Sequence, residues 1–388
     1  MGVNVLTKEL YSQLMESAKK IGQLAEQEVL AAEQNSSLSQ NVVDAIIEAG
    51  VNRLIIPKEY GYPQIDFTTY ADLVKEVGYY NLSAAWLTYF YSLHNAWVAY
   101  LPKHRMDEIY QDGGLLADIF APVGKAEKVD GGYILNGKWN YVSGINYSEW
   151  VSLGAIYFPE GEPMPERLAL CMSVSELEVV QDWNSLGLRG SGSNTVIATN
   201  LFVPEDMVIN FNDWTIHRKP QNLEIGEDYL YYNKPFFPAF YMGFAAMAIG
   251  GAERVIVEFI DRTKKRVRMD GTHEGQSAKA QRVAAELSLQ LKQAKGLLKE
   301  YIEMLETDQG QYNPGEYNAI RVQIVRNCLD IAIRATSSLG ATALIKGNPL
   351  EVMTRDLITI STHITSLYED GIDNYGKSLF GIQTMAIG

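Results

Sequence analysis

The sequence has little cysteine and a shortage of positive charge. Its 388 residues include only two cysteines, Cys171 and Cys328, and these lie far apart in the sequence. They cannot build a disulfide framework or a cysteine-based zinc site. We expect two buried, reduced thiols. The 33 lysines and arginines are outnumbered by 47 acidic residues, for a net charge of −14. Because nucleic-acid binding requires a basic face, no nucleic-acid partner is expected.

The sequence also lacks a long apolar run. The most apolar stretch, residues 84–101, is shorter than the roughly 20 residues that span a bilayer, and it carries His94 and Asn95 in its middle. A buried helix explains it better. The N-terminal segment becomes polar and charged too early for a signal peptide. We therefore expect a cytoplasmic protein with no membrane partner.

Several motifs of catalysis and ligand binding are missing. No G-x-G-x-x-G follows a strand, and no G-x-x-x-x-G-K-[ST] occurs. The five histidines include no H-x-x-x-H pair, so no metal site is indicated. The run Gly190-Ser-Gly-Ser193 is close to G-x-S-x-G, but Asn194 replaces the last glycine and a strand-like segment follows. These features argue against a hydrolase.

Hydrophobic periodicity predicts helices, then strands, then helices. In the N-terminal part, Val42, Val43, Ile46 and Ile47 share one helical face, and Gly50 stands where that helix would end. Aromatic and branched residues between glycine pairs predict strands in the middle. Near residue 241 the helical period returns, with small residues that permit close helix packing. We predict an α+β fold with an N-terminal helical domain (1–114), a middle β domain (115–210), an aromatic-rich connection (211–240) and a C-terminal helical bundle (241–388).

The predicted connection has no clear period. It contains tryptophan, tyrosine and phenylalanine side chains together with three prolines, and it is long for a simple link. Two interpretations fit equally well. The segment either covers an apolar substrate as a lid or packs as a separate aromatic cluster.

Two segments of the β region combine glycines, hydroxyl side chains and aromatic rings at turn positions. The first is GGYILNGKWNYVSG, residues 131–144, and the second is WNSLGLRGSGSNT, residues 183–195. Such turns can offer backbone N–H groups and hydroxyls to a polar, planar ligand while a tryptophan covers its face. Either segment alone is equally compatible with a tight hairpin.

Together and in this order, the two segments resemble the acyl-CoA dehydrogenase superfamily of flavoproteins. EAGVNRLIIPKEYG at 48–61 and RDLITISTH at 355–363 extend the resemblance over nearly the whole chain. The resemblance implies an N-terminal helical domain, a middle β-barrel-like domain and a C-terminal four-helix bundle. It also implies a flavin bound between the β domain and the bundle, and a homotetramer.

Within this superfamily, the details are similar to the oxygenase components of two-component flavin monooxygenases. The dehydrogenases usually carry T-E-P-x-A-G-S-D, where this sequence has the shorter Phe120-Ala-Pro-Val-Gly124-Lys-Ala126. The W-x-x-x-S-G and R-G-S-G-S segments, and NLSAAW at 81–86 with His94 after it, also match that branch. The resemblance implies an enzyme that uses O2 and reduced FMN or FAD from a separate flavin reductase to oxygenate a small aromatic or heteroatom-containing substrate.

The alternative is an acyl-CoA dehydrogenase with bound FAD. Its catalytic base would be Glu369, because Tyr368-Glu369 matches the start of the Y-E-G-T motif of the dehydrogenases. The sequence gap between Arg355-Asp356 and Glu369 is longer than the corresponding gap in the dehydrogenases by more than one helical turn. This difference moves the Glu369 side chain off the original face of the helix. The G-G-x-G run of the dehydrogenases is also missing. If Glu369 is not the catalytic base, it is a charged residue on the solvent-exposed side of a helix. A third hypothesis is a non-enzymatic scaffold with the same fold.

The resemblance assigns roles residue by residue. Ser143 matches the serine beside flavin N5, and Arg266 resembles an arginine that binds the flavin phosphate, although Arg262, Arg268 and Arg282 are close by. His94 and His363 are candidates for an acid/base or substrate-orienting pair, while a core role fits His94 equally well. The residues that match flavin-lining turns are Trp139, Gly144, Arg189, Ser191, Gly192 and Ser193.

Overall fold

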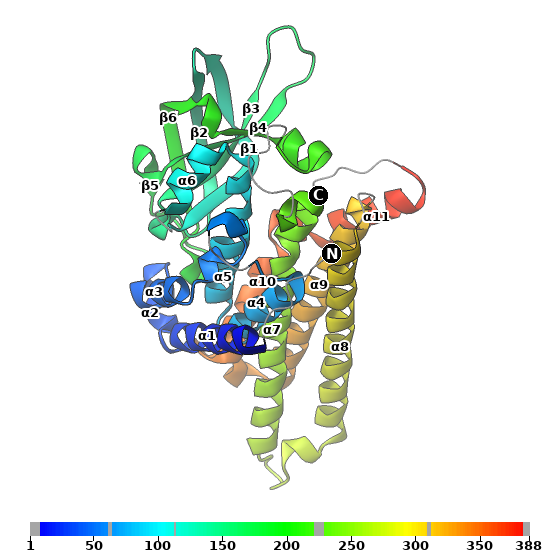
Figure 1. Ribbon diagram of the computed structural model, residues 1–388. Helices are drawn as coiled ribbons and strands as arrows, with labels where there is room; N and C mark the ends of the chain where they lie inside the picture. Colours follow the sequence, from blue (N-terminus) through cyan, green and yellow to red (C-terminus); the bar gives the residue numbers. More distant parts are fainter. Residues whose placement is uncertain (1–7, 61–63, 112–113, 221–228, 309–311, 383–388) are drawn as a thin grey trace.

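The computed structural model describes residues 8–60, 64–111, 114–220, 229–308 and 312–382. N-terminal helices are followed by one seven-stranded sheet and then by long C-terminal helices, as Figure 1 shows. This order confirms the predicted α+β fold. Gly61, the last residue of the segment 48–61, and residues 221–228 of the predicted connection lie outside the described residues.

The third helix shows how local sequence sets the N-terminal elements. Ser39 caps it by accepting a hydrogen bond from the backbone N–H of Val42, and Gly50 follows its end with a φ of +65°. Ile47 is 40% exposed, so the buried face is narrower than predicted. Ile47 lies about 100° around the helix from its buried neighbour Ile46. The N-terminal helices are α1 (Lys8–Gln27), α2 (Val29–Asn35), α3 (Gln40–Glu48), α4 (Phe67–Tyr80), α5 (Leu82–Leu93) and α6 (Lys103–Gln111).

The apolar stretch 84–101 is buried as predicted, but it is not a single helix. Helix α5 ends at Leu93, and 3-10 turns follow over His94–Tyr100. The two polar residues at this change both bond to other elements: His94 Nδ1 lies 2.7 Å from an Asp118 carboxylate oxygen, and Asn95 donates to the carbonyl of Asn52. In the part of the chain that the structure describes, no helix has both the length and the apolar composition that a bilayer span requires.

The sheet occupies the middle of the chain. Its strand order is β5-β6-β2-β1-β3-β4-β7, with β1 and β3 parallel and the other neighbours antiparallel. Both cysteines are buried and free, as predicted. The strands are β1 (Leu116–Val129), β2 (Gly132–Val142), β3 (Trp150–Tyr157), β4 (Glu166–Ser173), β5 (Glu178–Val180), β6 (Asn194–Pro204) and β7 (Val208–Asn210).

The first C-terminal helix, α7, crosses α4 with the two backbones in contact. A Cβ atom on Gly250 would lie 2.2 Å from the carbonyl oxygen of Lys75, and one on Gly78 would lie 2.9 Å from that of Met247. The small residues of α7 therefore permit the close approach that the sequence suggested. Helix α7 begins at Phe236, five residues before the predicted start. The C-terminal helices are α7 (Phe236–Lys265), α8 (Ala278–Thr307), α9 (Pro314–Leu339), α10 (Pro349–Ser361) and α11 (Tyr368–Leu379).

Candidate active site

The two predicted glycine- and serine-containing turns meet in a buried chain of hydroxyls. Ser143 follows β2, and Ser191 and Ser193 precede β6. The Oγ atom of Ser193 lies 2.9 Å from that of Ser143 and 2.8 Å from that of Ser191. Trp86 of α5 donates its indole N–H to Ser143 Oγ at 2.8 Å. Because an indole nitrogen can only donate, Ser143 accepts from Trp86 and keeps its own proton for another partner.

The backbone conformation and the close neighbours of Gly144 require a glycine at this position. Gly144 has a φ of +73°, and a Cβ atom there would lie 2.6 Å from the hydroxyl oxygen of Tyr91. That hydroxyl donates to the Gly144 carbonyl at 2.7 Å, while the Gly144 N–H donates to the carbonyl of Ser191. Gly192 also has a positive φ, +56°. Glycine conformations thus bring the two turns into contact.

Helix α10 holds the second turn through two neighbouring residues. The backbone N–H of Leu188 donates to the Asp356 carboxylate at 2.7 Å, and Arg355 donates to the carbonyl of Leu186 at 2.8 Å. Arg355 also forms ion pairs with Glu33 of α2 and with Glu351. Burial raises the pKa of Asp356 to about 7. The turn is therefore fixed by contacts with both helical regions.

His94 forms a buried dyad with Asp118 of β1. The histidine is 3% exposed and the aspartate 5% exposed. Because a carboxylate accepts hydrogen bonds, the 2.7 Å contact assigns the imidazole proton to Nδ1 and leaves the lone pair on Nε2. Nε2 is buried and has no hydrogen-bond partner among the described residues. The ring lies between Phe90 and Phe240, with centroid distances of 4.0 and 3.8 Å.

His363, just after α10, holds its proton on the opposite nitrogen. The backbone N–H of Thr365 donates to His363 Nδ1 at 3.3 Å, so Nδ1 accepts and Nε2 carries the proton. Desolvation by the surrounding protein is the main reason why the pKa of His363 is lowered to about 3, and repulsion from Arg321 and His94 adds to it. The imidazole is therefore neutral at physiological pH. It can donate a hydrogen bond from Nε2.

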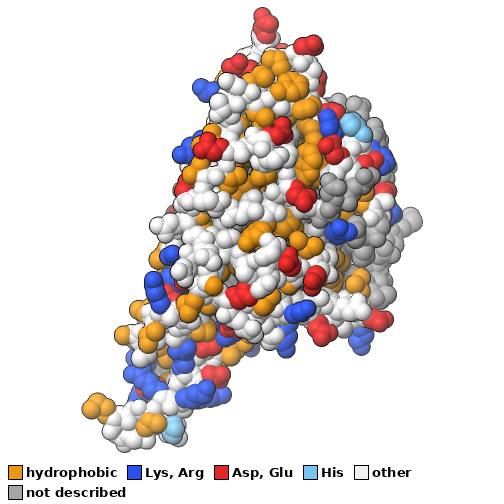
Figure 2. Space-filling view, turned by 90° about the vertical axis from the view of Figure 1, so that its left-hand side faces the viewer, with side chains coloured by type: hydrophobic (Ala, Val, Ile, Leu, Met, Phe, Trp, Pro, Cys, Tyr) orange, Lys and Arg blue, Asp and Glu red, His pale blue; other side chains and the backbone are white. Residues whose placement is uncertain are grey.

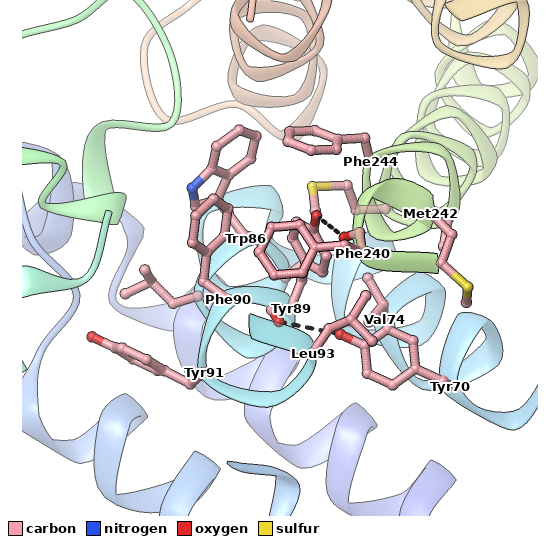
Figure 3. Close-up of a cluster of buried hydrophobic side chains, with 14 of the residues drawn as sticks. Tyr70, Val74, Trp86, Tyr89, Phe90, Tyr91, Leu93, Phe240, Met242 and Phe244 are labelled. Carbon is pink, nitrogen blue, oxygen red and sulfur yellow. Dashed lines mark hydrogen bonds between the residues drawn. The ribbon is translucent and has the colours of Figure 1, made fainter. Parts of the chain in front are cut away.

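One aromatic cluster connects the two histidines. Trp86 stacks on Phe90 at 5.1 Å, meets Phe244 edge to face, and lies 5.5 Å from the His363 ring. Figure 3 shows these rings converging from α5 and α7. Trp86 thus connects the two imidazoles to the hydroxyl chain. The cluster contains one imidazole that accepts at Nε2 and one that donates there.

Two other predicted site residues, Trp139 and Arg189, lie near the turns but do not belong to the hydroxyl chain. Trp139 is fully buried in the sheet, where its indole N–H donates to the carbonyl of Gly154 at 2.8 Å. A Cβ atom on Gly124 or Gly137 would collide with its ring. The structure therefore gives Trp139 a packing contact. Arg189 is half-buried, and its Nε has no partner among the described residues.

Arg266 and Glu369 do not join this cluster. Arg266 follows the C-terminal end of α7 and donates to the carbonyl of Leu339. It lies 22 residues beyond Phe244, which corresponds to about 33 Å along a helix. Figure 2 shows basic side chains at that narrow end of the molecule. Glu369 is exposed in the first turn of α11, so this structure provides no enclosed base there.

Sequence reasoning assigned no role to three residues that organise the site. Trp86 and Asp356 stand in segments that carry the family resemblance, whereas Asp118 stands in none of the motifs. A signal did exist for Asp118, because it is the one acidic residue in the apolar run LLADIF and a buried carboxylate needs a partner.

Cavity shape alone does not identify the site. A hollow of about 720 Å³ lies over α1 and α4, lined mainly by charged residues, and one of about 520 Å³ lies where α8 and α9 meet. Neither is lined by a predicted site residue. The buried hydroxyls and the unpartnered nitrogens of Arg189 and His94 instead suit a planar ring edged with nitrogen and oxygen atoms, as in a flavin.

Comparisons with known proteins agree with this chemistry. Residues 242–366 match the family model "Acyl-CoA dehydrogenase, C-terminal domain". The chain is 26% identical to the oxygenase component of p-hydroxyphenylacetate 3-hydroxylase from Acinetobacter baumannii, covering 91% of this chain and 85% of that protein. It is 27% identical to the flavin-dependent monooxygenase oxygenase subunit HsaA from Rhodococcus jostii, covering 87% and 90%.

Solved structures show the same fold. The HsaA monooxygenase from M. tuberculosis superposes with a TM-score of 0.87 at 21% identity, covering 97% of this chain and all of that one. XiaF from Streptomyces sp., solved with FADH2 and glycerol, gives a TM-score of 0.86 at 23% identity, covering 97% of both chains. The chain therefore has the fold of these oxygenase components, its residues 242–366 match the acyl-CoA dehydrogenase C-terminal domain, and it is similar in sequence to the oxygenase components of flavin-dependent monooxygenases.

Proposed function

We propose that this enzyme oxygenates a small aromatic substrate, using O2 and reduced FMN or FAD that a separate reductase supplies. The names of three relatives specify p-hydroxyphenylacetate, resorcinol and indole-3-acetate for those proteins, all of them aromatic. The observation that carries the proposal is the buried His94–Asp118 dyad, whose Nε2 lone pair lies in an aromatic cluster. We further propose a cytoplasmic homotetramer.

His94 acts as the base on the substrate. Its Nε2 takes the proton of a phenol, which makes the aromatic ring more electron-rich. Asp118 fixes the tautomer and stabilises the imidazolium that results. Phe90 and Phe240 exclude water from this exchange.

Ser143, Gly144 and the turn that contains Ser191 to Ser193 would hold the flavin ring when it is bound. Reduced flavin, when bound, supplies the electrons that activate O2. Ser143 accepts from Trp86, and with Ser193 as the donor in their 2.9 Å contact, its own O–H would be directed to the flavin. His363 donates from Nε2 toward oxygen in the site, and it does so as a neutral group because its pKa is low. Arg189 is the candidate partner of the flavin phosphate near this cluster.

Anaerobic stopped-flow absorbance tests this function. The protein is mixed with reduced FMN or FAD and then with oxygenated buffer. We expect a transient spectrum distinct from oxidised flavin, and oxygenated product when a phenol is present. Immediate return of oxidised flavin with every phenol and indole tested, together with bleaching of bound FAD by an acyl-CoA, would refute the proposal.

Histidine variants then test the assigned roles. His94→Ala and His363→Ala should each lower product formation by about 100-fold. The matched control is His104→Ala, because His104 is an exposed histidine that pairs with Asp206. Unchanged oxygen transfer in both site variants would show that these imidazoles have no catalytic role. Size-exclusion chromatography with light scattering tests the tetramer.

A further inference from the structure

Helix α9 carries a buried arginine without a counter-ion. Arg321 is 1% exposed, and its Nη2 donates to the side chain of Asn318 at 2.9 Å. Its Nε and Nη1 are buried and have no hydrogen-bond partner among the described residues. Burial lowers the pKa of Arg321, and no carboxylate in the described chain pairs with it. A guanidinium enclosed in this way is costly unless an anion completes it.

The neighbours of Arg321 do not supply this anion. Its guanidinium lies 5.0 Å from the centroid of the Tyr241 ring. The hydroxyls of the nearby Tyr89 and Tyr301 are already donated to carbonyls of the first turn of α7. The protein thus surrounds the cation with aromatic side chains and leaves two of its nitrogen atoms, Nε and Nη1, without a hydrogen-bond partner among the described residues.

A second arginine reinforces the positive charge. Arg167 of β4 lies over the Phe211 ring at 4.7 Å, its Nε is buried without a partner, and burial lowers its pKa. Burial raises the pKa of Tyr241 to about 12, although the charges of both arginines oppose this rise. The nearby acid is Asp118, and it is committed to His94. The region around Tyr241 therefore has an excess of positive charge.

This positive region continues directly from the proposed catalytic dyad. Phe240 stacks on the His94 ring at 3.8 Å, and its centroid lies 5.6 Å from that of Tyr241. An aromatic molecule with one end at His94 would have Phe240 and Tyr241 as its next aromatic neighbours, and the Arg321 guanidinium lies 5.0 Å from the Tyr241 ring centroid. The cation is thus positioned for the far end of such a molecule.

We infer that Arg321, assisted by Arg167, binds a carboxylate on the substrate, so that the enzyme is selective for aromatic acids over neutral aromatic compounds of the same shape. Nη2 donates one of its two protons to Asn318, so its second proton, together with an N–H of Nη1 or Nε, can bind both carboxylate oxygens in a planar pair. The inference rests on the proposed function, because it places the substrate ring at His94.

The test compares three phenols that share a ring and differ in the charge of the tail: 4-hydroxyphenylacetate, its neutral amide, and tyramine. We expect kcat/KM for the acid to exceed that for the amide by about 10- to 100-fold, the range for a hydrogen bond to a charged group. Arg321→Gln should remove the preference by raising KM for the acid while leaving the amide nearly unchanged. Arg321→Lys should restore part of it.

Controls separate recognition from folding. Arg326→Gln changes an exposed arginine of the same helix, paired with Asp330, and should leave the preference intact. Arg167→Gln should reduce the preference if Arg321→Gln does not fold. Equal kcat/KM for acid and amide in the parent enzyme would overturn the inference. So would a preference that survives both substitutions, or Arg321→Gln weakening reduced-flavin binding instead of acid binding.

Anaerobic calorimetry with the same three phenols distinguishes this inference from the proposed function. If no phenol is hydroxylated but the acid alone binds, and Arg321→Gln abolishes that binding, the anion site stands and the proposed reaction fails. If the phenols are hydroxylated without regard to tail charge, the reaction stands and the anion site fails.

Discussion

The buried carboxylate of Asp356 makes the stability of this enzyme depend on pH. Asp356 is 3% exposed and accepts from the Leu188 N–H. Burial raises its pKa from 3.8 to about 7. At about 1.4 kcal/mol per pKa unit, ionising it in the folded protein costs roughly 4 kcal/mol relative to the unfolded chain. Because the folded pKa is the higher one, the folded state retains a proton that the unfolded state releases. The free energy of unfolding should therefore fall as pH rises from about 4 to about 7.

The substitution Asp356→Asn should remove this dependence. The amide oxygen still accepts from Leu188, but the side chain no longer ionises. At pH 8 the variant should gain up to roughly 4 kcal/mol over the parent, and at pH 5 it should gain much less. Urea unfolding followed by tryptophan fluorescence at pH 5, 6, 7 and 8 measures this, with Asp330→Asn as an exposed control on α9. Parallel stability profiles for parent and variant would show that burial does not raise this pKa.

Three further predictions concern the site. Asp118→Asn should lower kcat for a phenol by about 100-fold without weakening reduced-flavin binding, because His94 loses the group that fixes its tautomer; an unchanged single-turnover rate would contradict this. With a pKa near 3, His363 contributes stability that is present above the unfolded-state pKa of about 6.5 and is lost as pH falls toward 3. Because His363 does not titrate between pH 5.5 and 8, His363→Asn should lower the rate without changing the shape of the pH–rate profile in that range. Gly144→Ala should lower the free energy of unfolding by about 1–3 kcal/mol, as measured by thermal unfolding, and should weaken flavin binding. Adding Tyr91→Phe to this variant should recover part of the loss, because it removes the hydroxyl that the new Cβ atom would contact.

The sequence alone predicted the order of the fold because that order depends on local periodicity. Helical spacing around Val42 and the glycine-bounded strand runs are short-range patterns, and each formed the expected kind of element. The break at His94 was missed because its causes, Asp118 and Asn52, are distant in the chain. Local propensity carries no information about such partners.

The site was predicted unevenly for the same reason. Ser143, Ser191 and Ser193 could be grouped because glycine turns mark them in the sequence, and the structure brings them within hydrogen-bonding distance. Arg321 could not be found in this way. It stands in a long amphipathic helix among other arginines, and only its burial separates it from Arg326 on the same helix.

The crossing of α4 and α7 determines which motions remain available to the enzyme. Packed helices usually slide past one another by small side-chain adjustments. Where Gly250 meets the backbone of Lys75, no side chain is present to adjust, and any sliding forces main-chain atoms together. The N-terminal and C-terminal helices should therefore move as one rigid body. Admission of a substrate then has to come from side-chain rotation at the first turns of α7, where Phe240 and Tyr241 lie, and hydrogen exchange should show those turns opening before the crossing does.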